Sequence, residues 1–163
     1  MNMKGQVSGI DMLFSVAIFT TILLSAAITW TSAFSYSEQR QKDSTIEAAA
    51  FSTANQLVSY GGYPDDWDAS NVAVIGLAKH PNVLDSAKLS AFASMNINSS
   101  KSLLGLERYG LHVRVFKTDA GGTNVSVFGE PPDVSATSIV VADSYSSLNG
   151  EMVVLRLTLW RLP

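Results

Sequence analysis

The sequence predicts an α+β protein: a long N-terminal helix followed by a small domain with about four antiparallel strands and one or two short helices. Three observations predict this fold class. Residues 12–37 contain no charged side chain. Residues 35–60 are more polar, lack Gly and Pro, and repeat apolar residues at helical spacing. From residue 109 onward, short runs alternate apolar and polar residues between turn-forming clusters, which is typical of strands.

The N-terminal run is long enough to cross a membrane. A bilayer core about 30 Å thick needs roughly 20 helical residues, and we expect the transmembrane part at about residues 10–34. The run is too long for the apolar core of a conventional secretory signal, which has about 7–15 residues. Lys4 precedes it, which favours a cytoplasmic N-terminus and a C-terminal domain outside the cell.

The helix is expected to continue beyond the membrane. A stripe of residues recurs at spacings of three and four, as on one face of an amphipathic helix: Ile46, Ala50, Thr53, Leu57 and Tyr60. Gly61-Gly62-Tyr63-Pro64 then ends it. A helix over residues 6–60 would be on the order of 80 Å long. Its second half would be the spine on which a head domain of residues 61–163 packs.

In the head, the sequence predicts two short helical segments and four strands. One helix covers residues 84–93, and Ser99 or Ser100 caps a further turn that Gly105 ends. The predicted strands are Tyr109–Lys117, Thr123–Phe128, Thr137–Ala142 and Met152–Leu162, with loops at Glu130–Asp133 and Asp143–Gly150. We expect them in meander order, with one face of the sheet buried on the spine helix.

Composition and motifs argue against several functions. The net charge of −3 gives no electrostatic footprint for nucleic acid. The absence of cysteine excludes a disulfide framework and a cysteine nucleophile. His80, in a predicted loop, and His112, on the polar face of a predicted strand, have no metal-ligating or catalytic partners nearby in sequence. We therefore expect no catalytic residue, no metal and no cofactor.

Two further segments of the head have specific predictions. The acidic stretch Asp65-Asp66-Trp67-Asp68 lacks the ligand spacing of a calcium loop, and we expect a solvated loop with the tryptophan tucked under the head. Asn98 and Asn124 each begin a glycosylation sequon, which is meaningful only if the head lies outside the cell.

The residues ahead of the apolar run carry a family resemblance. Lys4-Gly5-Gln6-x-Ser8, closely followed by an acidic residue, resembles the class III signal peptides of archaeal type IV pilin-like proteins. The resemblance implies that a prepilin peptidase removes a leader of residues 1–5, including Lys4, by cutting between Gly5 and Gln6. Ser8 then matches the family's serine at the third mature position. The family's acidic residue is fifth, whereas Asp11 is sixth, so either the spacing is tolerated or the cut is shifted by one residue.

Asp11 stands at the edge of the apolar run. A charge at the edge of hydrocarbon tends to persist where it finds a partner. The resemblance implies that Ser8 and Asp11 serve assembly, with the Asp11 carboxylate paired to the freed N-terminal amine of a neighbouring subunit. The alternative is that Asp11 lies among lipid headgroups and only interacts with the helix dipole.

The resemblance implies a structural subunit, an adhesion or minor pilin, of an archaeal type IV pilus-like surface filament. Its partners would be further copies of itself, other pilin subunits, the prepilin peptidase, a pilus assembly ATPase and a platform membrane protein. The precursor would lie in membrane lipid and the mature subunit in an extracellular filament. The alternative is a single-pass membrane-anchored protein with a ligand-binding or sensing head. A membrane-tethered enzyme has no residue constellation to support it.

Overall fold

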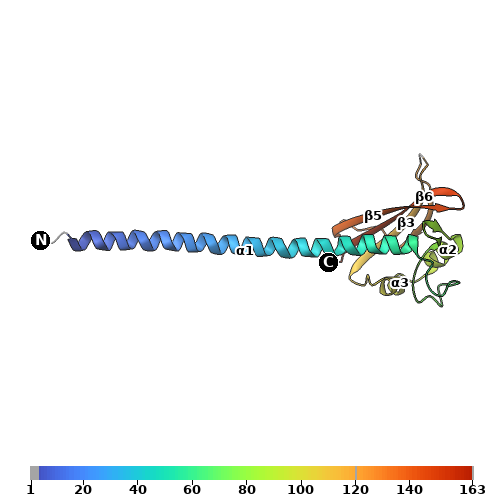
Figure 1. Cartoon of the computed structure of the whole chain (residues 1–163), viewed down its shortest axis with the longest axis horizontal. Coiled ribbons are helices and arrows are strands. Elements are labelled where there is room, and N and C mark those ends of the chain that lie inside the picture. The colour runs from blue at the N-terminus through green and yellow to red at the C-terminus, as the bar shows by residue number, and fades with distance from the viewer. Residues whose placement is uncertain (1–3, 120, 163) are drawn as a thin grey trace. The chain divides into compact units, whose positions relative to one another are not determined.

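The computed structural model describes residues 4–119 and 121–162, and within the N-terminal helix it describes the side chains of residues 9–34 and of residue 44 onward. The chain forms two compact units, Met1–Lys42 and Asp43–Pro163. The predicted long helix is confirmed as α1, Lys4–Ser59, which has 56 residues (Figure 1). The fold class is α+β, as predicted.

The last turns of α1 belong to the second unit and bury one face there. Ile46, Ala50 and Leu57 are fully buried, and Ala54 and Val58 extend the stripe that the sequence predicts. Burying an Ile or Leu side chain stabilises a fold by roughly 1.5–3 kcal/mol, so this face contributes substantially to the head.

Tyr60 was expected in the buried stripe, and this prediction is wrong. Its side chain is 63% exposed. The helix ends at Ser59, and the Tyr60 carbonyl accepts a hydrogen bond from Ala78 N–H, which turns the chain away from helical geometry.

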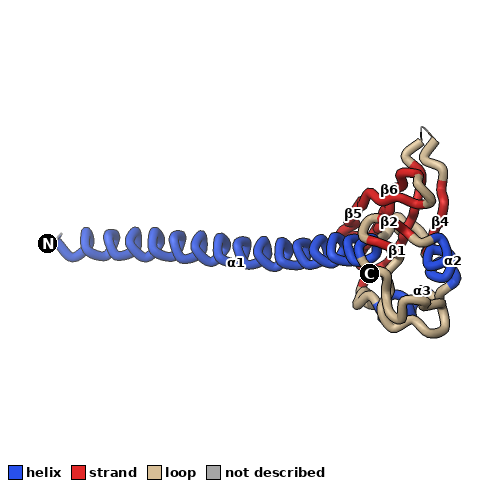
Figure 2. Tube along the Cα trace, turned by 45° about the vertical axis from the view of Figure 1, so that its right-hand side comes forward, coloured by secondary structure: helices blue, strands red, loops and turns tan. Residues whose placement is uncertain are grey.

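A six-stranded sheet forms the centre of the second unit, in the order β1-β2-β5-β6-β3-β4 (Figure 2). The strands are β1 (Ala78–His80), β2 (Val83–Leu84), β3 (Tyr109–Lys117), β4 (Asn124–Phe128), β5 (Thr137–Leu148) and β6 (Glu151–Arg161). β2 pairs with β5 in parallel, and the other pairs are antiparallel. The four predicted strands are therefore present, joined by two short ones that the sequence does not predict.

The predicted meander order is wrong. β3 pairs along its whole length with β6, which places β4 at one edge of the sheet and β5 on the opposite side of β6. The alternation of apolar residues assigns each side chain to a face, but it does not say which strand lies beside which. The two strands with the most buried residues, β3 and β6, are neighbours at the centre, which shields their apolar faces most completely.

The loop predicted at Asp143–Gly150 is also wrong, because β5 continues to Leu148. Polar residues at 143–147 suggest a loop, yet they alternate between exposed and buried positions as a strand requires. Asn149 and Gly150 then form the turn to β6, with φ values of 52° and 84°. Two consecutive positive φ angles are what a two-residue hairpin turn of the favoured type needs.

Helices α2 (Ser86–Ser94) and α3 (Ile97–Leu103) confirm the two predicted helical segments, but the predicted start at residue 84 is wrong because Leu84 lies in β2. The Asp85 side chain caps α2 by accepting from Ala87 N–H. The predicted cap of α3 is wrong, because Asn96 fills that position and accepts from the N–H of Asn98. Ser100 instead lies inside α3 and is fully buried, so its hydroxyl faces the core rather than the helix start.

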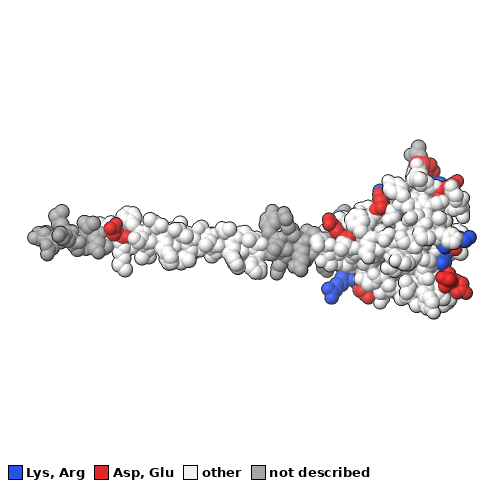
Figure 3. Space-filling model, viewed as in Figure 1, with Lys and Arg blue, Asp and Glu red and all other residues white. Residues whose placement is uncertain are grey.

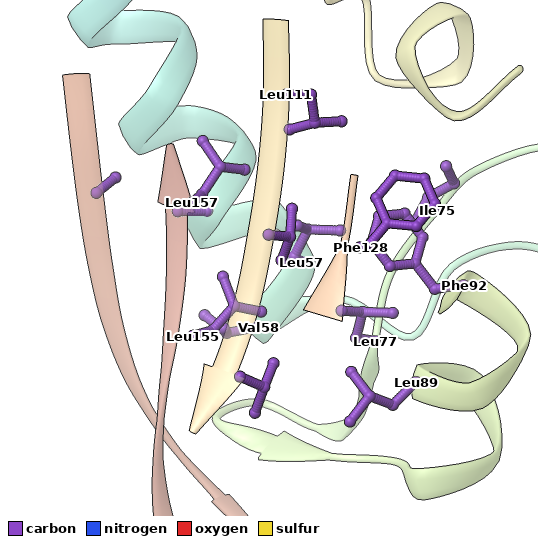
Figure 4. Packing of buried hydrophobic residues seen from close by; sticks show 14 of the residues in the cluster. Leu57, Val58, Ile75, Leu77, Leu89, Phe92, Leu111, Phe128, Leu155 and Leu157 are labelled. Carbon is purple, nitrogen blue, oxygen red and sulfur yellow. The ribbon is translucent and has the colours of Figure 1, made fainter. Parts of the chain in front are cut away.

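The core lies between one face of the sheet and the helical segments (Figure 4). Leu57 and Val58 of α1 approach Leu155 and Leu157 of β6 in this view, and the rings of Phe92 in α2 and Phe128 in β4 are 4.3 Å apart. Both helices therefore contribute to one continuous apolar cluster.

The prediction for Trp67 is confirmed: the side chain is buried while its acidic neighbours are exposed. The indole N–H donates to the carbonyls of Gly61 and Gly76, at 2.9 and 3.0 Å. A Cβ at Gly76 would overlap the Tyr60 carbonyl, so this close approach requires glycine. Trp67 therefore ties the end of α1 to the segment that leads into β1.

Candidate functional site: the apolar N-terminal helix

Residues Gly9–Phe34 of α1 form a helical stretch of 26 residues that is long and apolar enough to cross a membrane. None of it is buried within the described structure. Leu13, for example, leaves 73% of its surface exposed. In Figure 3 the described surface of this stretch is uncharged apart from one acidic residue. An exposed apolar surface of this extent is typical of a segment that contacts a membrane or another protein.

Hydroxyl groups within this stretch are already hydrogen-bonded. Every Ser and Thr between residues 9 and 34 donates to a main-chain carbonyl of the preceding turn: Ser15, Thr20, Thr21, Ser25, Thr29, Thr31 and Ser32. The donor–acceptor distances include 2.8 Å for Ser15 to Asp11 and 2.7 Å for Thr20 to Val16. Because hydrocarbon offers no hydrogen-bonding partners, polar groups satisfied within the helix are what a membrane-spanning segment needs.

Asp11 is the only charged residue of the stretch. Its side chain is exposed, and none of the described residues forms an ion pair or hydrogen bond with its carboxylate. The first turn of α1 contains no acidic residue, so Asp11 lies beyond it. Because the helix dipole acts mainly on the first turn, it gives this carboxylate little stabilisation. Among the described residues, the Asp11 carboxylate is therefore left without a charged partner.

The predicted processing residues lie at the very start of α1. The backbone of Lys4, Gly5, Gln6 and Ser8 is helical, and their side chains lie outside the described part of the structure. Residues 1–3 also lie outside it. The predicted cleavage and the role of Ser8 therefore stay predictions.

The two sequon asparagines both reach the surface of the head. Asn98 is exposed in α3, and Asn124 is exposed at the start of β4. Their serines differ: Ser100 is fully buried, whereas Ser126 is half-buried. The folded head therefore presents the second sequon more completely than the first.

The histidines and the acidic loop lie apart from each other. His80 is exposed at the end of β1, rather than in a loop as predicted. His112 lies half-buried on β3, where burial and, secondarily, the Arg114 guanidinium lower its pKa.

The Asp68 carboxylate accepts hydrogen bonds from Ser70 and Asn71, which lower its pKa and order the loop. Within residues 4–119 and 121–162, no group of three or more His, Cys, Asp and Glu could hold a metal ion.

Sequence reasoning missed a charged cluster on the face of the sheet that points away from the core. Arg156 of β6 makes a two-pronged contact with Asp143 of β5, with N–O distances of 2.7 and 2.6 Å. Arg114 and Arg156 are directly opposite each other in β3 and β6, and both guanidinium groups lie over the Phe116 ring. The sequence Asn149-Gly150 could have predicted this ion pair. It is typical of a two-residue hairpin turn, and the register that such a turn sets pairs Asp143 with Arg156.

Comparisons with protein-family models, with curated proteins and with solved structures find no match to this chain. The chemistry of the apolar helix and of the head is therefore the basis for any functional assignment.

Proposed function

We propose that this protein is a structural subunit of an archaeal type IV pilus-like surface filament. One observation carries the proposal: an unburied apolar helix whose hydroxyls are all satisfied and whose single carboxylate, Asp11, has no partner within the described chain. The residues before it, Lys4 to Ser8, resemble a class III signal peptide. A single N-terminal apolar helix joined to an α+β head fits both a membrane-anchored precursor and a filament subunit.

Assembly would exchange lipid for equivalent helices of other subunits. Lipid tails are as apolar as leucine, so this exchange gains little from the hydrophobic effect, and close packing and polar pairing decide whether helices associate. Asp11 supplies the polar pairing in this scheme. After cleavage between Gly5 and Gln6, the new amine of one subunit would face the Asp11 carboxylate of its neighbour.

The other parts of the proposal follow from the same scheme. The precursor lies in the membrane with the head outside the cell, and the mature subunit lies in the surface filament. A prepilin peptidase trims it, and a pilus assembly ATPase, a platform membrane protein and other pilin subunits would complete the machinery. The proposed role is structural and assigns no reaction to the head.

Intact-mass and N-terminal mass spectrometry of the chain co-expressed with an archaeal prepilin peptidase tests the proposal. We expect a mature protein that begins at Gln6; a protein beginning at Val7 would place Asp11 at the fifth mature position. Co-expression with a catalytically inactive peptidase is the matched control. An intact N-terminus with the active enzyme would refute the proposal and favour the single-pass anchored alternative.

A further inference from the structure

A pocket of about 270 Å³ opens beside Trp160 on the head. This Trp160 pocket is lined by α3, by β3 and β6, and by the segment after β4: Ile97, Asn98, Lys101, Gly110, Leu111, Gly129, Glu130 and Trp160. β4 ends at Phe128, opposite Val113, so the first residues of β3 have no β4 neighbour. The pocket occupies this gap in the sheet.

The Trp160 ring is held in place by a glycine. Gly110 is directly opposite Trp160 in the β3–β6 ladder, and a Cβ at Gly110 would overlap the indole ring. The ring therefore packs directly on the β3 main chain while the side chain stays half-exposed at the pocket. Covering a strand glycine with a cross-strand aromatic explains the position of the ring, but it does not explain the polar groups beside it.

Three polar side chains at the pocket have no partner. Within the described residues, the Asn98 amide, the Lys101 ammonium and the Glu130 carboxylate make no hydrogen bond or ion pair with any side chain or main-chain group. Together they offer donors and acceptors, and their charges cancel. Asn98 and Glu130 are exposed and Lys101 is half-buried.

The cavity beside Tyr145 also has an aromatic ring and polar groups, but no charged side chain lines it. Two further cavities of the described head also differ from the Trp160 pocket. A cavity beside Tyr60 also contains an aromatic ring, but the Gln56 amide there is bound to the Ile75 carbonyl. In the cavity along α2, the Ser90 and Ser94 hydroxyls bond to carbonyls of their own helix.

These features define a ligand class. The volume lies below the roughly 300–1,000 Å³ of sites for drug-sized molecules, which points to a ligand the size of one ring. The balanced charge favours a neutral ligand, and the unpaired donors and acceptors favour one with many hydroxyl groups. A flat indole face suits the C–H face of such a ring. We propose that the Trp160 pocket binds a single neutral sugar unit, a role independent of helix assembly.

Saturation-transfer difference NMR on the full chain tests this site. The protein is produced in a bacterial host without N-glycosylation, so that Asn98 is unmodified, and is held in micelles of a sugar-free detergent. The probes are glucose, galactose, mannose and N-acetylglucosamine, with free glutamate and free lysine as charged ligands of comparable size. We expect transfer to ring protons of at least one sugar and none to the amino acids. Transfer to no sugar, or to the amino acids alone, would overturn the proposal.

Variants assign the signal to the pocket. Lys101→Ala and Glu130→Ala each remove a charged hydrogen-bonding group, and we expect each to weaken sugar binding by about tenfold or more. Trp160→Ala should abolish it. Tyr145→Ala, which removes an exposed aromatic outside the pocket, and Lys79→Ala, in β1, are the matched controls and should bind like the wild type.

Thermal unfolding of each variant, followed by circular dichroism, separates lost binding from lost folding. Because Trp160→Ala uncovers Gly110 and can itself unfold the head, the two surface variants decide the matter. Wild-type affinity in folded Lys101→Ala and Glu130→Ala proteins would show that the sugar binds elsewhere and would refute the assignment.

Discussion

Replacing Asp11 with alanine should leave membrane insertion nearly unchanged and strongly reduce entry into filaments. The stretch Gly9–Phe34 has 26 residues, which at about 1.5 Å per residue makes it roughly 39 Å long against a hydrocarbon core of about 30 Å. Asp11 is near its N-terminal end, so in a membrane it lies at the interface. A carboxylate costs roughly 2.5–3.5 kcal/mol at the bilayer centre and much less at the edge, so we expect Asp11→Ala to change insertion by less than about 1 kcal/mol.

In a filament core the same residue lies among helices rather than beside water. Removing one partner of a buried ion pair costs about 3–5 kcal/mol, because the other charge is left uncompensated. We therefore expect the Asp11→Ala subunit to enter filaments roughly 150- to 4,000-fold less efficiently than the wild type. A large loss of filament entry together with unchanged membrane insertion would identify Asp11 as an assembly residue.

The assay is competitive co-expression of tagged wild-type and variant chains, with quantitative mass spectrometry of sheared filaments and of the membrane fraction. Ser15→Ala is the matched control. It removes a hydroxyl that bonds to the Asp11 carbonyl while leaving the carboxylate in place, and should assemble normally. Incorporation of processed Asp11→Ala at the wild-type level would refute the reasoning, and so would a variant that fails to insert.

Two further predictions concern the head. Trp67→Phe removes the indole N–H that donates to Gly61 and Gly76. The buried Gly76 carbonyl then loses its donor, whereas the Gly61 carbonyl keeps the Lys88 ammonium. We expect the free energy of unfolding to fall by about 1–3 kcal/mol in denaturant titrations; unchanged stability would contradict the structure. The pKa of Asp68 is lowered from 3.8 by hydrogen bonds from Ser70 and Asn71, so the unfolded chain binds more protons than the folded chain near this pH. The ionised Asp68 carboxylate therefore stabilises the folded chain above pH 3.8, and this stabilisation is lost as the pH falls through the lower pKa of the folded state. Asp68→Asn should therefore flatten the acid limb of a stability–pH curve, with Asp65→Asn as the control, and an unaltered limb would count against the loop geometry.

The parts of the fold that depend on local pattern could be predicted from the sequence. β3 has the predicted bounds because Tyr109–Lys117 alternates cleanly, and α1 continues because no Gly or Pro interrupts residues 10–60. The stop signals at Gly61 and Gly105 act locally as well. These features require only the periodicity and the conformational preferences of neighbouring residues.

The features that depend on partners distant in sequence could not be predicted. Ser146 is buried in β5 although the polar residues around it favour a loop, because tertiary pairing with β6 outweighs local propensity. The Trp160 pocket exists because β4 ends early and α3 lies beside the gap. The residues next to Trp160 in the sequence predict neither feature. The sequence places Asp11 near the N-terminal edge of the apolar run. The structure adds that the helix begins at Lys4, so that Asp11 lies beyond its first turn.

The hydroxyl groups between residues 9 and 34 have a consequence for how a subunit could move. Each is bonded to a carbonyl of its own helix, so replacing lipid by a neighbouring helix, or the reverse, breaks no hydrogen bond along this length. Hydrogen bonds of these hydroxyls would then add little to the energy of leaving or re-entering the bilayer, and Asp11 is the one charged group of the described stretch whose surroundings would change. In a filament built on such helices, much of the barrier to adding or releasing a subunit would lie at one carboxylate, and that residue would influence the rate of exchange between membrane and filament.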